Sequence, residues 1–240
     1  MIDYHKYQKE INDILKDTII IKHIPHSSLL FPKDYDDDNL KRIYGLDYKI
    51  QNIKLADLFI DYLFKDIKGI EIKAKYSRMR CDVEKYRDDK KEIMSKYGLG
   101  YIYTKNIFNN KPYHRNLIQN KIDIDTYYDS HHRRLTNETK KILSKGQKVL
   151  ILDLHSYSDE QALLIGKQGP FPDICIGIND NDNQIDQRLL SLIIRIIKDH
   201  GYTYQINYPY SGAIIPNNLT AQEKDRVSSI MIEINKRVYL

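Results

Sequence analysis

Two histidines that follow apolar stretches of the sequence could bind a metal ion. His26 follows the β-branched run 18–24 (TIIIKHI) and Pro25, which fixes a turn. His155 follows the apolar run 149–154 (VLILDL). Imidazole is the commonest metal ligand among side chains. From position alone, His26 is a metal ligand at an exposed sheet edge, a surface-loop histidine, or a histidine that hydrogen-bonds the loop to itself. Two histidines at the ends of two strands favour a shared metal ion.

Two carboxylates accompany these histidines. Asp153 lies two residues before His155, so both side chains point to the same side of a strand. Asp153 either orients a ligating imidazole or simply polarises His155. Glu233 interrupts the apolar run 230–234 (IMIEI), and a buried carboxylate is unfavourable unless it is paired or functional. Partial burial would raise the pKa of Glu233, which suits a general base or acid near neutral pH. The alternatives are a salt bridge with Lys236 or Arg237, or a solvent-facing place on an edge strand.

Charged side chains are concentrated in residues 76–87 (YSRMRCDVEKYR). Arginine suits the binding of carboxylates, although ion pairs at a solvated strand end are the common explanation of such a cluster. His131 and His132 are neighbours on a predicted helix, so at most one of them should point into a site. The other histidines, His5, His23, His114 and His200, lack a supporting pattern and are expected to be structural or on the surface.

Several common catalytic and ligand-binding motifs are absent from the sequence. There is no glycine-rich dinucleotide or phosphate loop, no H-E-x-x-H, no pair of C-x-x-C units and no G-x-S-x-G elbow. These absences leave the histidines and carboxylates as the main candidates for chemistry.

The elements that must position these residues alternate between strands and helices. The apolar patterns predict strands at 18–24, 70–76, 149–154, 174–178, 203–206 and 230–234, and helices at 3–15, 47–65, 124–143, 184–198 and 217–226. Residues 34–38 and 98–112 are expected to be loops. This alternation predicts one α/β domain over residues 1–240, with a mostly parallel, mixed central sheet and helices on both faces. Ligands bind at the carboxyl ends of such strands, where His26, Arg78 and His155 fall.

The composition indicates a globular protein. Of 240 residues, 41% are hydrophobic and 30% charged, and the net charge is +5. No dense Lys/Arg block indicates nucleic acid, and no apolar run approaches the roughly 18 residues of a membrane helix. The polar N-terminus lacks the apolar core of a secretory signal, and two isolated cysteines suit a reducing compartment. We therefore expect a cytoplasmic protein that binds neither nucleic acid nor membranes; its oligomeric state stays open.

Ordered motifs over about residues 18–240 resemble those of the N-formylglutamate amidohydrolase family. IPHSS, YSRMRCDVEKY, DLHSYS, PDICIG, NYPYSGAIIP and MIEINKRVYL occur in the family's order, and residues 57–64 (DLFIDYLF) match its D-x-x-x-D-x-L-[FY]. The family is similar to zinc carboxypeptidases and aspartoacylases. The resemblance implies a zinc-carboxypeptidase-like fold, one zinc ion and hydrolysis of the N-acyl amide of a small amino acid that bears a carboxylate.

The resemblance also assigns roles to individual residues. His26 and His155 would bind zinc, with Asp57 as the third ligand and Glu84 as the alternative. Glu233 would be the general base. Arg78, either alone or together with Arg80, would anchor a substrate carboxylate or stabilise the oxyanion. The expected substrate-binding residues are Glu84, Lys85, His132 and Gly212.

Three departures from the family pattern affect the expected substrate. Lys85 stands where the family usually has arginine, and Ser28 and Ser211 replace glycines. The pocket is therefore expected to differ in shape. A carboxypeptidase-like or other N-acyl-amino-acid hydrolase is the first alternative, and a metal-free binding module is the second.

Overall fold

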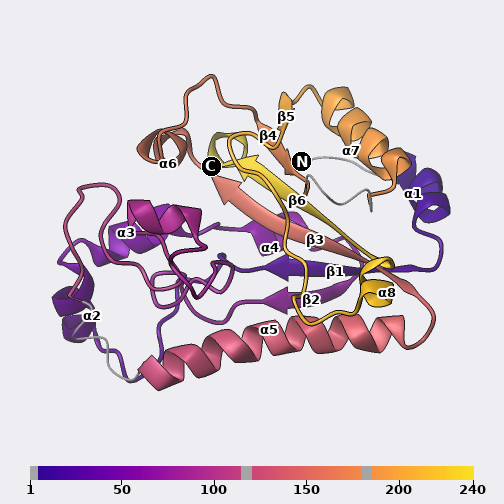
Figure 1. Cartoon of the computed structure of the whole chain (residues 1–240). Coiled ribbons are helices and arrows are strands. Elements are labelled where there is room, and N and C mark those ends of the chain that lie inside the picture. Colours follow the sequence, from indigo (N-terminus) through magenta and orange to yellow (C-terminus); the bar gives the residue numbers. More distant parts are fainter. Residues whose placement is uncertain (1–4, 115–120, 180–184) are drawn as a thin grey trace.

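The computed structural model describes residues 5–114, 121–179 and 185–240, and its centre is a six-stranded sheet (Figure 1). The strand order is β2-β1-β3-β6-β4-β5. All neighbouring strands pair in parallel except β4 and β6, which are antiparallel. The strands are β1 (Thr18–Ile24), β2 (Ile70–Lys73), β3 (Lys148–Tyr157), β4 (Ile174–Gly177), β5 (Tyr204–Ile206) and β6 (Val227–Asn235). The prediction of a mostly parallel, mixed sheet is confirmed.

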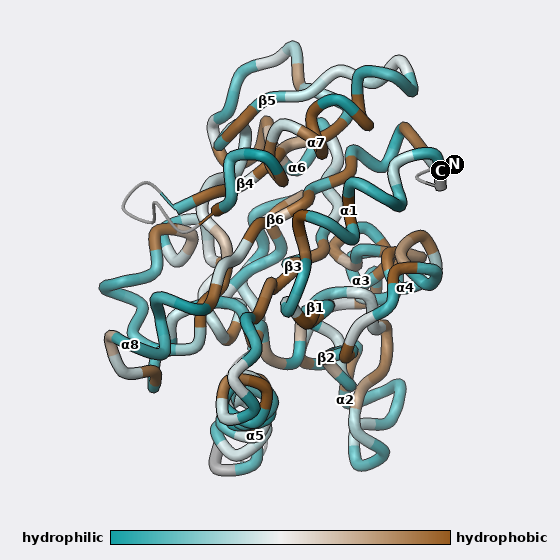
Figure 2. Tube along the Cα trace, turned by 90° about the vertical axis from the view of Figure 1, so that its right-hand side faces the viewer, coloured by the Kyte–Doolittle hydropathy of each residue, from teal (hydrophilic) through white to brown (hydrophobic). Residues whose placement is uncertain are grey.

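Helices cover both faces of this sheet. On one face, α1 (Gln8–Ile14), α4 (Ile60–Leu63) and α7 (Gln187–Asp199) lie next to an apolar cluster that contains Leu150 and Ile230. On the other, α5 (Lys121–Leu143) packs Leu135 against Ile21 and Ile151. Figure 2 shows hydrophobic residues along β3 and β6 in the centre of the molecule. The expected α/β architecture is therefore confirmed.

The single helix predicted over 47–65 is wrong, because the chain leaves the helical conformation at Ala56. Helix α3 (Tyr48–Leu55) ends there, with Ala56 in an extended conformation. The backbone N–H of Asp57 donates to the carbonyl of His26 at 2.9 Å. Phe59 then adopts a left-handed conformation with φ of 63° before α4 begins. The break places Asp57 beside the loop that carries His26.

Other predicted elements differ mainly at their ends. The acidic stretch 34–38 is not only loop, because the Asp36 side chain caps α2 (Asp37–Tyr44). The strand predicted at 70–76 stops at Lys73, and the helix predicted at 217–226 is the short α8 (Ala221–Lys224), capped by Thr220. Residues 3, 4 and 184 of two predicted helices lie outside the described residues. The remaining elements are α6 (Asp159–Leu164) and the 3-10 turns η1 (His5–Tyr7), η2 (Ile93–Tyr97) and η4 (Lys236–Val238).

The carboxyl ends of β1, β3 and β6 meet at one edge of the sheet. In the register of β3 and β6, His155 lies opposite Glu233, and β1 ends just before Pro25 and His26. Among the helices described, none has the length and apolar character that crossing a membrane requires.

Candidate active site

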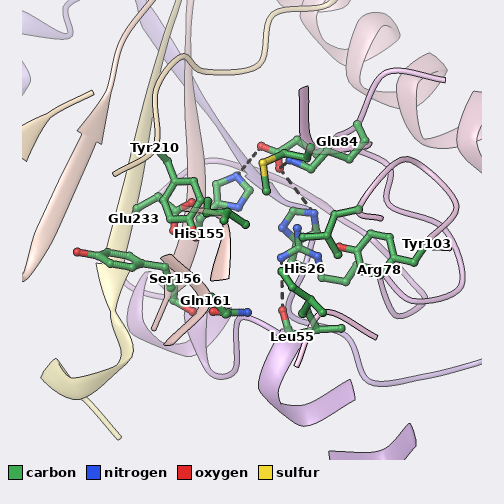
Figure 3. Close-up of a pocket in the computed structure, with 16 residues that line it drawn as sticks. His26, Leu55, Arg78, Glu84, Tyr103, His155, Ser156, Gln161, Tyr210 and Glu233 are labelled. Carbon is green, nitrogen blue, oxygen red and sulfur yellow. Dashed lines mark hydrogen bonds and ion pairs between the residues drawn. The ribbon is translucent and has the colours of Figure 1, made fainter. Parts of the chain in front are cut away.

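The rings of His26 and His155 lie side by side at this edge, with centroids 5.1 Å apart (Figure 3). Both residues are buried, with relative exposures of 1% and 2%. His26 is thus no surface histidine, and the expectation of an exposed sheet edge is wrong. The loop after β1 is tied to two neighbouring segments, because the Asn52 side chain donates to the carbonyl of Leu29 and the backbone N–H of Ser77 donates to the carbonyl of Leu30.

The Nε2 atoms of both imidazoles contact buried carboxylates. Asp82 lies 2.8 Å from Nε2 of His26, and Asp153 lies 2.9 Å from Nε2 of His155. Both carboxylates are fully buried. Burial opposes their ionisation, but the neighbouring imidazoles outweigh it and lower the pKa of each carboxyl below its usual range. A carboxylate that accepts from one ring nitrogen fixes the tautomer and leaves the other nitrogen free to bind a metal.

The opposite nitrogens of the two rings face Asp57. Its Oδ2 lies 3.5 Å from Nδ1 of His26 and 3.4 Å from Nδ1 of His155. Asp57 is 1% exposed. Within the described part of the chain, neither of its oxygens nor Nδ1 of His26 has a hydrogen-bond partner. Burial works against ionisation of Asp57, but the two imidazoles lower its pKa, so a buried negative charge faces two ring nitrogens.

Glu84 contacts the imidazoles on the side of their Nε2 atoms. One oxygen lies 3.0 Å from Nε2 of His155, and the other lies 3.7 Å from Nε2 of His26. The same carboxylate pairs with the ammonium of Lys85 at 3.5 Å. Ligand atoms of His26, Glu84 and His155 all lie within 4.8 Å of one another, so they form a set that could hold a cation, and His23, Asp153 and His155 form another.

Glu233 lies in the middle of the sheet and lines the pocket beside His155. Its relative exposure is 7%, and its Oε2 has no hydrogen-bond partner in the described segments. Burial raises the pKa of its carboxyl to about 7, although the nearby His155 opposes this rise. Arg237 instead pairs with Asp159 and Asp173, and Lys236 donates to the carbonyl of Lys54. The salt-bridge and edge-strand alternatives for Glu233 are therefore wrong.

Asp82 joins the first histidine to Arg78. Its Oδ2 accepts from Nε and Nη2 of Arg78 at 3.1 and 2.9 Å and from the hydroxyl of Tyr103 at 2.8 Å. Arg78 also donates to the carbonyl of Leu55 and lines the pocket. Arg80 packs on the ring of Tyr35 and is not among the described residues that line the pocket. The position of Arg78 is thus set by Asp82.

We expect Asp82→Asn to lower the free energy of unfolding by on the order of 3 kcal/mol, because it leaves Arg78 without its counter-charge in a largely buried place. Tyr103→Phe is the matched control, since it removes one neutral donor to the same carboxylate and should cost about 1–2 kcal/mol. Urea denaturation of both variants measures the difference. Equal losses would show that the charge of Asp82 adds nothing to its hydrogen bonds.

Behind the second histidine lies a buried pair that the sequence patterns did not single out. Asp153 accepts from Nδ1 of His23 at 2.7 Å as well as contacting His155, and its second oxygen accepts from the backbone of Ile214. Nε2 of His23 lies 2.9 Å from Nε2 of His131 on α5. The parallel register that pairs His23 with Asp153 creates this contact. His23 is structural, as expected, and it holds the carboxylate that orients His155.

Other residues with expected roles lie outside the pocket lining in the described chain. His132 stacks on Tyr128, and its Nε2 contacts the carbonyl of Val83 at 2.7 Å, so it supports the segment that carries Glu84. Gly212 has a positive φ of 81°, and its carbonyl approaches Gly177 too closely for a side chain there. Ser28 donates to the carbonyl of Lys75, and Ser211 is exposed.

The pocket itself combines this polar group with an apolar wall (Figure 3). His26, Arg78, Glu84, Lys85, His155 and Glu233 form its polar part. The rest of its lining consists of Leu55, Met94, Leu99, Tyr103, Ile107, Ser156, Tyr157, Gln161, Ile165 and Tyr210. The pocket thus places buried imidazoles and carboxylates, which are groups that can bind a metal ion, next to a carboxylate whose pKa is raised. Such an arrangement is suited to the activation of water.

Solved structures share this fold. The N-formylglutamate amidohydrolase from Ralstonia eutropha JMP134 is 21% identical, with a TM-score of 0.70 over 92% of this chain and 83% of that chain. The gene product Atu2144 from Agrobacterium tumefaciens is 16% identical, with a TM-score of 0.54 over 94% of this chain and 82% of that one. A search of curated protein sequences gave no match.

Family membership rests on the sequence rather than on these structures. A model of the N-formylglutamate amidohydrolase family matches residues 19–240, which is most of the chain. The match includes the histidine loop, the arginine-rich segment and the closing strand described above. The chain therefore belongs to the N-formylglutamate amidohydrolase family, and it is a hydrolase of the class that cleaves amide carbon–nitrogen bonds.

Proposed function

We propose that the chain is a zinc-dependent amidohydrolase that removes an N-acyl group of the formyl type from a small amino acid bearing a carboxylate. The observation that carries the proposal is the donor set around Asp57. A buried carboxylate without hydrogen bonds faces Nδ1 of two imidazoles, at 3.4 and 3.5 Å. Without a cation this arrangement leaves a buried charge incompletely compensated, which is unfavourable.

The donor set fits zinc in kind. Two imidazoles and one carboxylate are a typical catalytic zinc set, which leaves one position open. Asp82 and Asp153 already hold the Nε2 sides of the rings. We therefore assign His26, His155 and Asp57 as ligands, and Glu84 to the pocket wall.

When bound there, zinc would acidify a water molecule and polarise the scissile carbonyl. Glu233 supplies the base, because burial raises the pKa of its carboxyl to about 7 and its Oε2 is free of hydrogen bonds in the described chain. The carboxylate takes a proton from the attacking water and passes it to the leaving amine. The products are a carboxylic acid, formate for a formyl substrate, and a free amino acid.

Two cations hold the substrate in this proposal. Lys85 lines the pocket, and within the described residues its ammonium has an ion pair with Glu84 alone, at 3.5 Å, so it is available to a substrate carboxylate. Arg78, fixed by Asp82, lines the pocket, and its N–H groups that are not bonded to Asp82 or Leu55 would stabilise the oxyanion. Lysine serves as a point charge where the family usually has the bidentate arginine.

The test of this proposal is metal content together with turnover. We expect purified protein to contain about one zinc per chain by elemental analysis, and to release formate from N-formyl amino acids. Chelation should abolish hydrolysis, and added zinc should restore it. Full activity in a metal-free sample would end the zinc mechanism. A zinc-free protein without hydrolase activity would favour the binding-module alternative, and cleavage of short peptides would favour the carboxypeptidase-like one.

A further inference from the structure

The pocket has an apolar side that a substrate with a second carboxylate would not use. Its members are Leu55, Met94, Leu99, Ile107 and Ile165. All five belong to, or pack against, one hydrophobic cluster around Tyr44 and Tyr103. Leu55, Leu99 and Ile165 are buried, whereas Met94 and Ile107 are only partly covered. A bound ligand would therefore meet the two partly covered side chains on this side.

Positive charge is scarce in the same pocket. Among its described lining residues the cations are Arg78 and Lys85, against the carboxylates of Glu84 and Glu233. Asp82 holds Arg78 through two nitrogens. Lys85 is therefore the cation best placed to receive a carboxylate from a ligand. Two further lining residues are neutral and polar: Gln161 already donates its amide to the carbonyl of Lys54, and the hydroxyl of Ser156 has no hydrogen-bond partner in the described chain but carries no charge to balance a carboxylate.

This balance of positive and negative side chains in the pocket lining suits a substrate that brings one carboxylate. An N-formylglutamate molecule brings two carboxylates, and with the first on Lys85 the second would lie against the apolar side or near Glu84. An unpaired carboxylate in an apolar surrounding is strongly unfavourable. An aliphatic side chain in the same place would instead bury apolar surface, which is favourable.

We propose that this chain prefers N-acyl derivatives of amino acids with an apolar side chain, such as leucine or methionine, over those of glutamate. The inference rests on the proposed function, because it concerns the substrate class of the same site. Met94 and Ile107 are the residues that set the preference, since they are the partly covered members of the apolar side.

The first test compares N-formyl-leucine with N-formylglutamate on the unmodified protein. We expect kcat/KM to be on the order of 30-fold or more higher for the leucine compound. Equal or better hydrolysis of the glutamate compound would overturn the inference and leave the hydrolase function standing. Isothermal titration calorimetry of both compounds with a Glu233→Gln variant gives a readout that does not need turnover. If neither compound is cleaved, tighter binding of the leucine compound supports the inference, and equal or weaker binding overturns it.

A charge introduced at the apolar side gives the second test. Met94→Arg places a cation in the lining and should shift the ratio of kcat/KM toward glutamate by about tenfold or more. Ile93→Arg is the matched control. Ile93 precedes Met94 in the chain, but it is 74% exposed and does not line the pocket in the described chain. An equal shift in both variants would show that net charge alone, rather than this wall, governs the preference.

Discussion

Replacement of Glu233 by glutamine is expected to lower kcat by about 100- to 10,000-fold while zinc stays bound. Glutamine keeps the shape of the side chain but cannot accept a proton from water. The carboxylate lies outside the three assigned metal ligands, so metal content should remain at that of the unmodified protein. Steady-state kinetics and elemental analysis of the same sample check both halves of the prediction.

A control variant separates this role from a general effect of losing a negative charge. Glu160 lies on α6 with an exposed side chain that pairs with Lys54. Glu160→Gln makes the same chemical change outside the pocket lining and should leave kcat unchanged. Normal turnover in Glu233→Gln would remove Glu233 from the base role, and loss of zinc in that variant would instead make it a metal ligand.

The raised pKa of Glu233 also predicts how the stability of the metal-free protein, prepared with a chelator, depends on pH. The pKa of Glu233 rises from 4.5 to about 7 on folding, mainly through burial. A group with a raised folded pKa stabilises the fold below its unfolded pKa and loses that contribution as pH rises through the folded value. At about 1.36 kcal/mol per unit, ionisation of Glu233 costs up to about 3 kcal/mol above pH 7.

At about pH 8, the free energy of unfolding of metal-free Glu233→Gln should therefore exceed that of the metal-free unmodified protein by up to about 3 kcal/mol. The difference should vanish near pH 4.5, where the glutamate is protonated in the folded protein. Thermal unfolding at several pH values measures this change. A constant difference across this range would show that the carboxyl does not titrate as its burial predicts.

The sequence patterns predicted the sheet well because each central strand is an apolar run. Burial on both faces accounts for the short apolar runs inside these strands, which are 19–21 (III) in β1, 149–152 (VLIL) in β3 and 230–232 (IMI) in β6. The same reasoning missed the break between α3 and α4, since the apolar spacing continues through it. A tertiary hydrogen bond from Asp57 to the carbonyl of His26 replaces the helical one there. Periodicity carries no information about such a partner.

The site was predictable in part for the same reason. His26, His155 and Glu233 follow from strand ends and from a charge inside an apolar run. Asp57 followed only from the family resemblance, and the contact between His23 and Asp153 depends on the register of two strands that are 130 residues apart. The position of His132 behind Val83, rather than in the pocket, depends on how α5 rotates about its axis. Local sequence does not determine either feature.

Loss of Asp57 is expected to weaken zinc binding far more than loss of Glu84. Asp57→Ala removes a carboxylate that faces both Nδ1 atoms, whereas Glu84→Ala removes one that lies on the side of Nε2. Removal of a partner outside the metal ligands costs roughly 10- to 100-fold in metal affinity. We expect Glu84→Ala to stay within that range, and Asp57→Ala to exceed it, as should His155→Ala. Competition with a chromophoric chelator gives the affinities, and circular dichroism checks that each variant is folded.

The opposite result would change the chemistry of the site and not only one ligand. If Glu84 proved essential and Asp57 dispensable, zinc would lie at the Nε2 atoms, which now contact Asp82 and Asp153 at 2.8 and 2.9 Å. Metal binding would then have to displace both contacts, and Arg78 would move with Asp82. Because Nδ1 of His26 and both oxygens of Asp57 have no hydrogen-bond partner in the described chain, binding there requires no such rearrangement. The ranking of these two variants therefore tests whether the protein is already organised for its metal.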